Sequence, residues 1–357
     1  MISTLATRLR TTTSCLQRAS KFLTTAPSTR ISEPISLAPA TTTTTSRTFS
    51  ASAAAATAKM SKSVAAASHA DFNRNSLFDL KGRVALVTGG GSGIGLMITQ
   101  ALAVNGAKVY IVGRTGEKLD TVASTYNKDI EGSIVPLAGD VTKKEEVARL
   151  ADEIAAREEC LCILVNNAGV SSETVQAESA SAAEMRRNLF DTSKTTAADW
   201  LATYETDVVS LFFATTAFLP LLQRSAERHP HWSGAVINVT SISGLVKSAQ
   251  HHFAYNAAKG AANHLTRMLA AEVAAQGHKV RVNALAPGVF PSEMTAGESD
   301  RFQKSHLDKS AYEGKVPAGR PGRDIDMAQA VLALACNQYI HGQTLVVDGG
   351  YTLSIGQ

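Results

Sequence analysis

Short apolar runs alternate with longer amphipathic segments from residue 83 to the end of the chain. The apolar runs are predicted strands, and they cover residues 83–88, 108–113, 133–140, 162–169, 235–241, 280–288 and 343–350. Residues 94–106, 116–127 and 143–157 have the spacing of amphipathic helices. Strands that are apolar on both faces and alternate with helices indicate a parallel sheet covered on both sides. We therefore predict an α/β fold with one doubly wound, parallel, seven-stranded sheet.

Residues 1–71 differ in composition and are predicted to be a disordered leader before a single domain of residues 72–357. The first 70 residues contain eight Lys or Arg and one acid, which leaves 27 basic and 30 acidic residues, a net charge of −3, in the rest. A Ser/Thr-rich basic leader is typical of a mitochondrial transit peptide, and equally of a disordered tail. We expect the mitochondrial matrix, with a cytoplasmic form starting at Met60 as an alternative. The basic charge belongs to the leader, so we expect no nucleic-acid binding.

No apolar run approaches the length needed to cross a bilayer, and we expect no membrane span. The four cysteines are Cys15, Cys160, Cys162 and Cys336. They have no zinc-like spacing and suit a reduced compartment. We therefore interpret them as packing residues and predict no metal site.

The segment TGGGSGIG, residues 88–95, lies between the first predicted strand and the first predicted helix. Glycines let a backbone approach a pyrophosphate closely, and free N–H groups at a helix start favour a phosphate. The sequence therefore predicts a dinucleotide site that includes Gly89, Gly91, Ser92, Gly93, Ile94 and Gly95.

The type of dinucleotide depends on the end of the second predicted strand. An acid there would bind the adenosine 2′-hydroxyl, whereas an arginine accommodates a 2′-phosphate. This chain has Gly113 followed by Arg114 and no acid. We therefore expect NADP(H) rather than NAD(H), with Arg114 at the 2′-phosphate.

The pentapeptide YNAAK places Tyr255 and Lys259 four residues apart, on one face of a predicted helix. An ammonium ion close to a phenol favours the phenolate, so such a tyrosine could exchange a proton with a carbonyl or alcohol oxygen near neutral pH. Taken alone, the pair could also be a surface lysine on an ordinary amphipathic helix.

Several motifs together resemble the short-chain dehydrogenase/reductase family from about residue 82 to 353. They are T-G-x-x-x-G-I-G, NNAG at 166–169, a serine after the fifth strand, Y-x-x-x-K and a later PG. The resemblance implies a Rossmann fold and hydride transfer between a nicotinamide and a carbonyl or alcohol. Its catalytic residues would be Ser241, which orients the substrate oxygen, Tyr255, which transfers the proton, and Lys259, which also holds the ribose. Further implied cofactor contacts are Asp140, Val141, Asn167, Ala168, Gly169, Pro287, Gly288 and Val289.

Two details of this resemblance concern single residues. The S-x-x-G spacing to Gly244 favours Ser241 over Thr240 and Ser243 as the catalytic hydroxyl. The family usually has an asparagine in the helix after the fourth strand, where it orders a water that connects the lysine to solvent. This chain has Asp207 there. An aspartate could still bind water, but its charge would change the proton relay.

The favoured function is an NADP(H)-dependent carbonyl reductase for a small-molecule carbonyl or alcohol. NALAPGVFPSEMT and GRPG resemble reductases of 3-oxoacyl thioesters. Residues 289–318 are the expected substrate lid, and residues 170–198 a second wall. The segment VVDGGY resembles the family's last strand, which implies a homodimer or homotetramer. Two alternatives stay open: a non-catalytic dinucleotide-binding sensor or subunit, and an NAD-dependent dehydrogenase of steroids or sugars.

Overall fold

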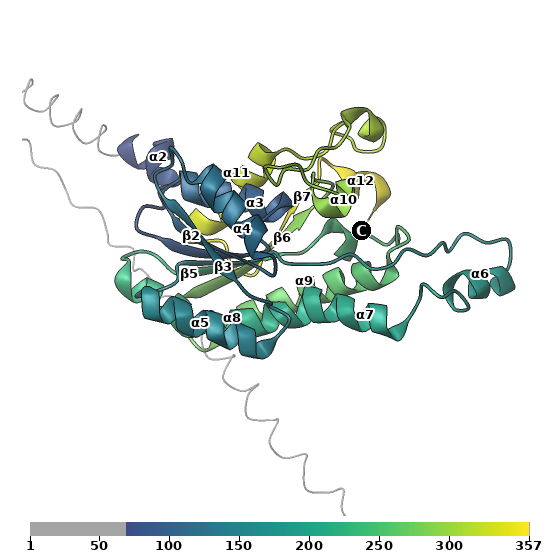
Figure 1. Ribbon diagram of the computed structural model, residues 1–357, viewed down its shortest axis with the longest axis horizontal. Helices are drawn as coiled ribbons and strands as arrows, with labels where there is room; N and C mark the ends of the chain where they lie inside the picture. The colour runs from purple at the N-terminus through teal and green to yellow at the C-terminus, as the bar shows by residue number, and fades with distance from the viewer. Residues whose placement is uncertain (1–68, 357) are drawn as a thin grey trace, which may run out of the picture. The chain divides into compact units, whose positions relative to one another are not determined.

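The computed structural model describes residues 69–356, so almost all of the predicted leader, with its targeting signal, lies outside the described residues. A short helix, α2 (Arg74–Leu77), precedes the sheet. All seven predicted strands are present: β1 (Val84–Thr88), β2 (Lys108–Gly113), β3 (Ser133–Ala138), β4 (Ile163–Asn166), β5 (Gly234–Val239), β6 (Val280–Pro287) and β7 (Thr344–Val347). They form one parallel sheet in the order β3-β2-β1-β4-β5-β6-β7, which confirms the predicted fold (Figure 1).

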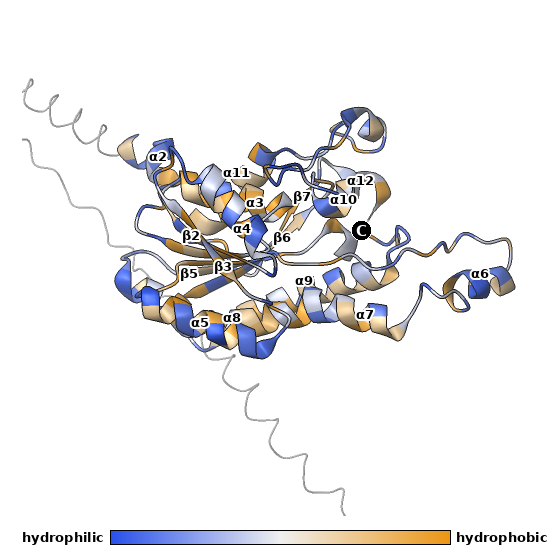
Figure 2. Cartoon of the chain, viewed as in Figure 1, coloured by the Kyte–Doolittle hydropathy of each residue, from blue (hydrophilic) through white to orange (hydrophobic). Residues whose placement is uncertain are grey.

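Helices cover both faces of this sheet (Figure 1). One face carries α3 (Gly93–Val104), α4 (Gly116–Tyr126) and α11 (Asp324–Cys336). The other carries α5 (Lys144–Arg157), α8 (Ser210–Arg228) and α9 (Phe253–Ala275). In Figure 2 the hydrophobic colour concentrates in the strands and on the helix surfaces that face them.

The strands supply side chains alternately to two hydrophobic cores. In β1, Ala85 and Val87 belong to the core under α3 and α11, whereas Leu86 belongs to the core under α5, α8 and α9. Successive side chains of a strand point to opposite faces, so a strand buried on both faces must be apolar throughout. This is why the central strands read as continuous apolar runs in the sequence.

The direction of the chain across the sheet changes at β1. Val87 pairs with Ile111 of β2 on one side and with Val165 of β4 on the other. The strand order therefore runs outward from β1 in both directions. A crevice forms at the carboxyl ends of the strands at such a point, and ligands of doubly wound proteins bind there.

A single long helix runs from Ala197 to Arg228 and includes α7 (Ala197–Tyr204), a π-helical turn η1 (Glu205–Val209) and α8. With 32 residues and a mean hydropathy of 1.3 over its most apolar window, it is long and apolar enough to span a membrane. Such a helix was not expected from the sequence. In the fold, α8 packs against β4, β5 and α5, and Phe218, Leu221 and Leu222 lie in the core.

Residues 170–198 and 289–322, in which the sequence shows only weak periodicity, contain short elements that were not predicted from the sequence. Residues 170–198 include α6 (Ala182–Leu189), which has no buried residue and projects from the rest of the fold (Figure 1). Its start is capped by Ser181, whose Oγ accepts a hydrogen bond from Glu184 N at 3.2 Å. Residues 289–322 include α10 (Glu293–Ala296) and a 3-10 turn, η3 (Lys309–Tyr312). A last helix, α12 (Tyr351–Ile355), follows β7.

Candidate active site

A cleft of about 380 Å³ opens at the carboxyl ends of β1, β2, β3 and β4. The glycine-rich loop, the ends of these strands, α9 and α10 line it. The predicted cofactor residues that lie in this lining are Gly89, Gly91, Ser92, Gly93, Ile94, Gly95, Arg114, Asp140, Val141, Asn167, Ala168, Gly169, Tyr255 and Lys259. The structure thus brings together residues from well-separated parts of the sequence.

Within the glycine-rich loop, two backbone segments pass too close together for side chains. A Cβ on Gly95 would lie 2.0 Å from the carbonyl oxygen of Gly89. Gly89 itself has a φ of +66°, in the region that favours glycine. The loop leads directly into α3, whose first N–H groups have no partner within the helix. This cradle fits a pyrophosphate, because only backbone amides and the helix dipole face the anion.

Thr88 and Asn167 hold the loop after β1 against the loop after β4. Thr88 Oγ1 accepts hydrogen bonds from the backbone N–H groups of Asn167 at 2.9 Å and Ala168 at 3.0 Å. In return, Asn167 Nδ2 donates to the carbonyl oxygens of Thr88 at 2.9 Å and Gly89 at 3.2 Å. The amide side chain of Asn167 therefore shapes the cradle.

Arg114 and Asp140 lie at the end of the cleft formed by β2 and β3. Arg114 is exposed at the rim. Partial burial opposes ionisation of Asp140, but two hydrogen bonds from Thr142 and the charge of Arg114 hold the pKa of Asp140 below its usual value. Asp140 Oδ1 accepts from Thr142 N at 3.0 Å and Thr142 Oγ1 at 2.8 Å. This end of the cleft thus holds an arginine close to a fixed carboxylate.

Ser241 ends the turn after β5, where it caps the 3-10 turn η2 (Ile242–Gly244). Its Oγ accepts a hydrogen bond from Ser243 N at 3.1 Å. A Cβ on Gly244 would lie 2.4 Å from the carbonyl carbon of Lys259, so η2 touches the backbone of α9 directly. The S-x-x-G spacing therefore brings Ser241 to the part of α9 that carries Tyr255 and Lys259.

The hydroxyls beside Ser241 are already used within the fold. Thr240 Oγ1 donates to Leu285 O at 3.2 Å, and Ser243 Oγ donates to Gln250 Oε1 at 3.2 Å. In the part of the chain that the structure describes, Ser241 Oγ takes part only in the bond from Ser243 N. Its own hydrogen is therefore available for a substrate oxygen.

Tyr255 and Lys259 lie one turn apart on α9. The Lys259 ammonium is 5.5 Å from the centre of the Tyr255 ring. It is buried, donates to Val239 O at 3.4 Å and lies 3.5 Å from Asp207 Oδ2. The lysine thus joins the tyrosine to the end of β5 and to the π-helical turn.

Asp207 is completely buried, in η1. Its Oδ1 accepts a hydrogen bond from Val170 N at 2.9 Å, while Oδ2 has only the ion pair with Lys259 among the described residues. Burial raises the pKa of Asp207, and the attraction of Lys259 only partly offsets this effect. π-Helical turns occur frequently at functional sites, and this one directs the carboxylate at Lys259. The sequence identified the position of Asp207 but not the turn that orients it.

The residues after β6 that line the cleft follow the predicted cofactor contacts in the sequence. Pro287, Gly288 and Val289 are absent from its lining, and Ser292, Glu293 and Met294 are present. Gly288 packs instead against the end of β7, where a Cβ would lie 2.8 Å from the Cα of Asp348.

Glu293 of α10 forms a salt bridge with Lys118 of α4 at 2.6 Å. The hydrogen bond from Lys118 holds the pKa of Glu293 below its usual value. This ion pair, which no sequence motif indicates, connects α10 to α4 at the edge of the cleft.

The segment 170–198 lies beside the catalytic helix, where a second wall was predicted. Tyr255 N donates to Ser172 Oγ at 3.3 Å, and Val175 N donates to His251 O at 2.9 Å. The ring of His252 lies 6.3 Å from that of Tyr255, edge to face. A separate hollow of about 200 Å³ lies between this segment, Trp200 and the start of α9.

A family model described as "short chain dehydrogenase" matches residues 83–302. This match covers more than half of the chain and all of the residues around Ser241, Tyr255 and Lys259. The chain belongs to the short-chain dehydrogenase family. It is therefore an oxidoreductase that acts on small-molecule alcohols or carbonyls with a nicotinamide dinucleotide.

Two curated relatives and one solved structure are similar to this short-chain dehydrogenase over most of its length. It is 37% identical to a galactitol 2-dehydrogenase (L-tagatose-forming) of Cereibacter sphaeroides, over 78% of this chain and 98% of the relative. It is 34% identical to a rhamnolipids biosynthesis 3-oxoacyl-[acyl-carrier-protein] reductase of Pseudomonas aeruginosa, over 77% of this chain and 98% of the relative. The Pseudomonas aeruginosa RhlG/NADP active-site complex superimposes with a TM-score of 0.64 at 34% identity, covering 77% of this chain and 98% of that one.

Proposed function

We propose that this short-chain dehydrogenase is an NADP(H)-dependent carbonyl reductase. The observation that carries the choice of cofactor is Arg114, an exposed cation that directly follows β2 at the adenosine end of the cleft. No acid precedes it at the end of β2, where a carboxylate would repel a 2′-phosphate. The NADP complex of a relative at 34% identity supports the same choice.

The chain's own residues supply orientation and the proton. The bound nicotinamide supplies the hydride. Ser241 Oγ donates a hydrogen bond to the substrate carbonyl oxygen, and Tyr255 Oη gives that oxygen its proton. Lys259 holds its positive charge beside the Tyr255 ring, and Asp207 holds Lys259 from the opposite side. Asp207 also connects Lys259 to the backbone of Val170, at the entrance of the second wall.

The proposed substrates are 3-oxoacyl thioesters or similar ketones with an extended chain. Two observations support this class: the 3-oxoacyl reductase relative, and a separate hollow between residues 170–198 and the start of α9, lined by Ala254, the neighbour of Tyr255 in the chain. The galactitol 2-dehydrogenase relative favours a second candidate, the oxidation of a polyol. Because fold and family do not determine substrate, both classes belong in the same test.

The test uses the whole chain and follows the absorbance of the reduced nicotinamide. NADPH and NADH are compared with a short 3-oxoacyl thioester, and NADP⁺ and NAD⁺ with galactitol. We expect turnover of the thioester with NADPH, and a loss of about 10²- to 10⁴-fold in Tyr255→Phe, the range of general acid–base catalysis. Cofactor binding by that variant should remain, which separates loss of chemistry from loss of folding.

Arg114→Ala tests the choice of cofactor. One charge-assisted contact contributes about 1.5–3 kcal/mol, so the preference for NADPH over NADH should fall roughly 10- to 100-fold. Arg157→Ala, at the exposed end of α5, is the matched control. An unchanged preference in Arg114→Ala, or turnover of galactitol with NAD⁺ alone, would overturn the proposed cofactor. Tight NADPH binding without any turnover would support a sensor instead.

A further inference from the structure

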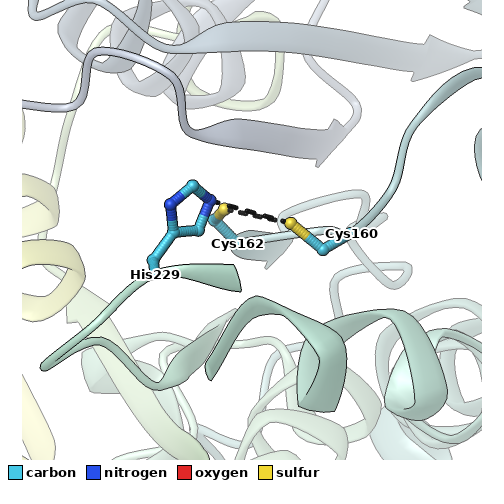
Figure 3. Close-up of side chains that lie close together, drawn as sticks. All are labelled: Cys160, Cys162 and His229. Atoms are coloured by element: carbon cyan, nitrogen blue, oxygen red, sulfur yellow. Dashed lines mark hydrogen bonds between the residues drawn. The ribbon is translucent and has the colours of Figure 1, made fainter. Parts of the chain in front are cut away.

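Two cysteines and a histidine meet at the amino end of β4, opposite the cleft. Cys160 and Cys162 precede β4, and His229 follows the last residue of α8 (Figure 3). Cys160 Sγ lies 3.9 Å from Cys162 Sγ and 3.8 Å from His229 Nε2. From the sequence, both cysteines were interpreted as packing residues and were not connected with His229. Three potential ligand atoms in this arrangement suit either a metal ion or thiol chemistry.

The orientation of His229 decides between these two. Arg83 Nη1 lies 2.8 Å from His229 Nδ1. A guanidinium can only donate, so Nδ1 must accept, and the neutral ring carries its proton on Nε2. That N–H faces the sulfur of Cys160. A metal ion at this position would have to displace the proton and would lie close to the Arg83 cation, so the arrangement favours anionic sulfur over a bound cation.

Other groups around the two sulfurs are also donors. Ser225 Oγ is buried, has no hydrogen-bond partner among the N and O atoms of the described residues, and faces Cys162. Buried donors without acceptors cost free energy. A thiolate is the acceptor that would satisfy the nearby donors.

The two sulfurs lie close enough to share one proton. The hydrogen bond from Cys160 lowers the pKa of Cys162 to about 6. The same shared proton, together with burial, raises the pKa of Cys160. The pair therefore offers one thiolate, which is a nucleophile, and one thiol, which can resolve an oxidised sulfur.

We propose that Cys160 and Cys162 form a redox-active dithiol that hydrogen peroxide converts to a disulfide within the chain. The thiolate of the pair attacks peroxide, forming a sulfenic acid and releasing hydroxide. The second sulfur then attacks the sulfenic sulfur, an S–S bond forms, and water leaves with the remaining proton. In sum, one thiolate and one thiol lose two electrons, and peroxide is reduced to one water and one hydroxide.

The position of the pair suits a small oxidant and a reversible bond. Cys160 is 5% exposed and borders the half-buried His229, whereas Cys162 is fully buried. The sulfurs must approach from 3.9 Å to about 2.05 Å, with only Leu161 between the two residues. Strained disulfides have more oxidising potentials and are easily reduced, so thiols should restore the dithiol.

The experiment oxidises the whole chain, carrying Cys15→Ser, with hydrogen peroxide and identifies the products by mass spectrometry. We expect a Cys160–Cys162 disulfide that dithiothreitol reverses, formed with a rate that rises with pH around a midpoint near 6. Cys336 is the internal control, because burial raises its pKa to about 11 and no second sulfur lies beside it in the described residues. It should remain reduced.

Variants separate reactivity from packing. Cys160→Ser and Cys162→Ser should each abolish the disulfide while carbonyl reduction continues, since neither residue is near the cleft. Arg228→Met should move the midpoint of the oxidation rate upward, because the charge of Arg228 lowers the pKa of Cys160. Arg157→Met serves as its control, with an unchanged midpoint.

Oxidation of Cys336 at the same rate as the pair would overturn the proposal, as would a sulfinic acid without any disulfide or an oxidation rate that does not depend on pH. Tight binding of Cd²⁺, seen by thiolate-to-metal absorption and lost in His229→Asn, would also overturn it. That outcome would identify the cluster as a metal site instead.

Discussion

The glycine-rich loop and residues 170–198 are built in opposite ways. The loop is shaped by backbone: Gly95 approaches Gly89, and Asn167 and Thr88 bond to main-chain atoms. Most residues of 170–198 are exposed, α6 buries none of its side chains, and Phe190 is 74% exposed. Ser172 anchors the segment to the first turn of α9, and Val175 anchors it to the loop before α9.

With the proposed function, the difference matches what each region would recognise. The pyrophosphate of a dinucleotide is the same in every reaction. Its binding site can therefore consist of backbone groups, which most side-chain substitutions leave unchanged. A substrate varies between enzymes, and an exposed segment that rests on a few contacts can change without disturbing the sheet. We therefore expect the glycine-rich loop to be the more rigid region and residues 170–198 to tolerate more substitutions.

Gly95→Ala should have the largest effect, because its Cβ would lie 2.0 Å from Gly89 O. We expect dinucleotide binding to weaken by more than about 100-fold and the free energy of unfolding to fall by about 1–3 kcal/mol, the range for overpacking. Gly116→Ala is the control, since no atom lies within 4 Å of the position that its Cβ would take. Fluorescence titration with NADPH and urea unfolding would measure both. Normal binding by Gly95→Ala would contradict the backbone cradle.

Asp207→Asn tests the residue that joins the two regions. Burial raises the pKa of Asp207 above 3.8, so its protonated form is favoured on folding. Its contribution to stability is therefore present below pH 3.8 and is lost as pH rises through the folded pKa. Asp207→Asn should lack this loss. The free energy of unfolding of the variant minus that of wild type should therefore increase by about 1 kcal/mol as pH rises. Urea unfolding between pH 4 and 8 gives the difference, and a flat difference would argue against the raised pKa.

Glu293→Gln should have a smaller effect, because Lys118 and Glu293 are both partly exposed. An exposed ion pair contributes about 0–1 kcal/mol, so NADPH should dissociate at most about fivefold faster. Since the pKa of Glu293 is lowered from 4.5, the ion pair acts above that pH and is lost as pH falls through the folded pKa. Stopped-flow dissociation would measure the rate, with the exposed Glu298→Gln as control. Equal dissociation rates in both variants would show that the ion pair between Lys118 and Glu293 does not slow the release of NADPH.

Phe190→Ser should have the smallest effect, within about 0.5 kcal/mol in the free energy of unfolding, as for other exposed positions. Phe218→Ala, in the core under α8, should lose about 3–5 kcal/mol. Urea unfolding of both variants compares the two regions directly. A large loss in Phe190→Ser would mean that α6 is covered by a partner.

The sequence predicted the parts of the molecule that rest on local patterns. β2 lies at residues 108–113 as predicted, because an apolar run bounded by glycines admits one interpretation. The glycine-rich loop and YNAAK were found because their chemistry requires contiguous residues. Lys118 and Glu293 escaped prediction because 175 residues separate two ordinary charges. His229 escaped for the same reason, since only the fold brings it to the cysteines. The π-helical turn leaves no mark in composition.

That turn has a consequence for the long helix. A π-helical turn closes its hydrogen bonds over five residues instead of four and so widens the helix locally. The buried positions Thr203, Asp207, Ser210, Leu211 and Ala214 nevertheless follow the spacing of one helix face. Asp207 therefore belongs to the same inward face as the apolar residues of α8, and this face delivers a carboxylate to Lys259 as well as side chains to the core. One surface of one helix thus serves both the packing of the sheet and the charge balance of the candidate active site.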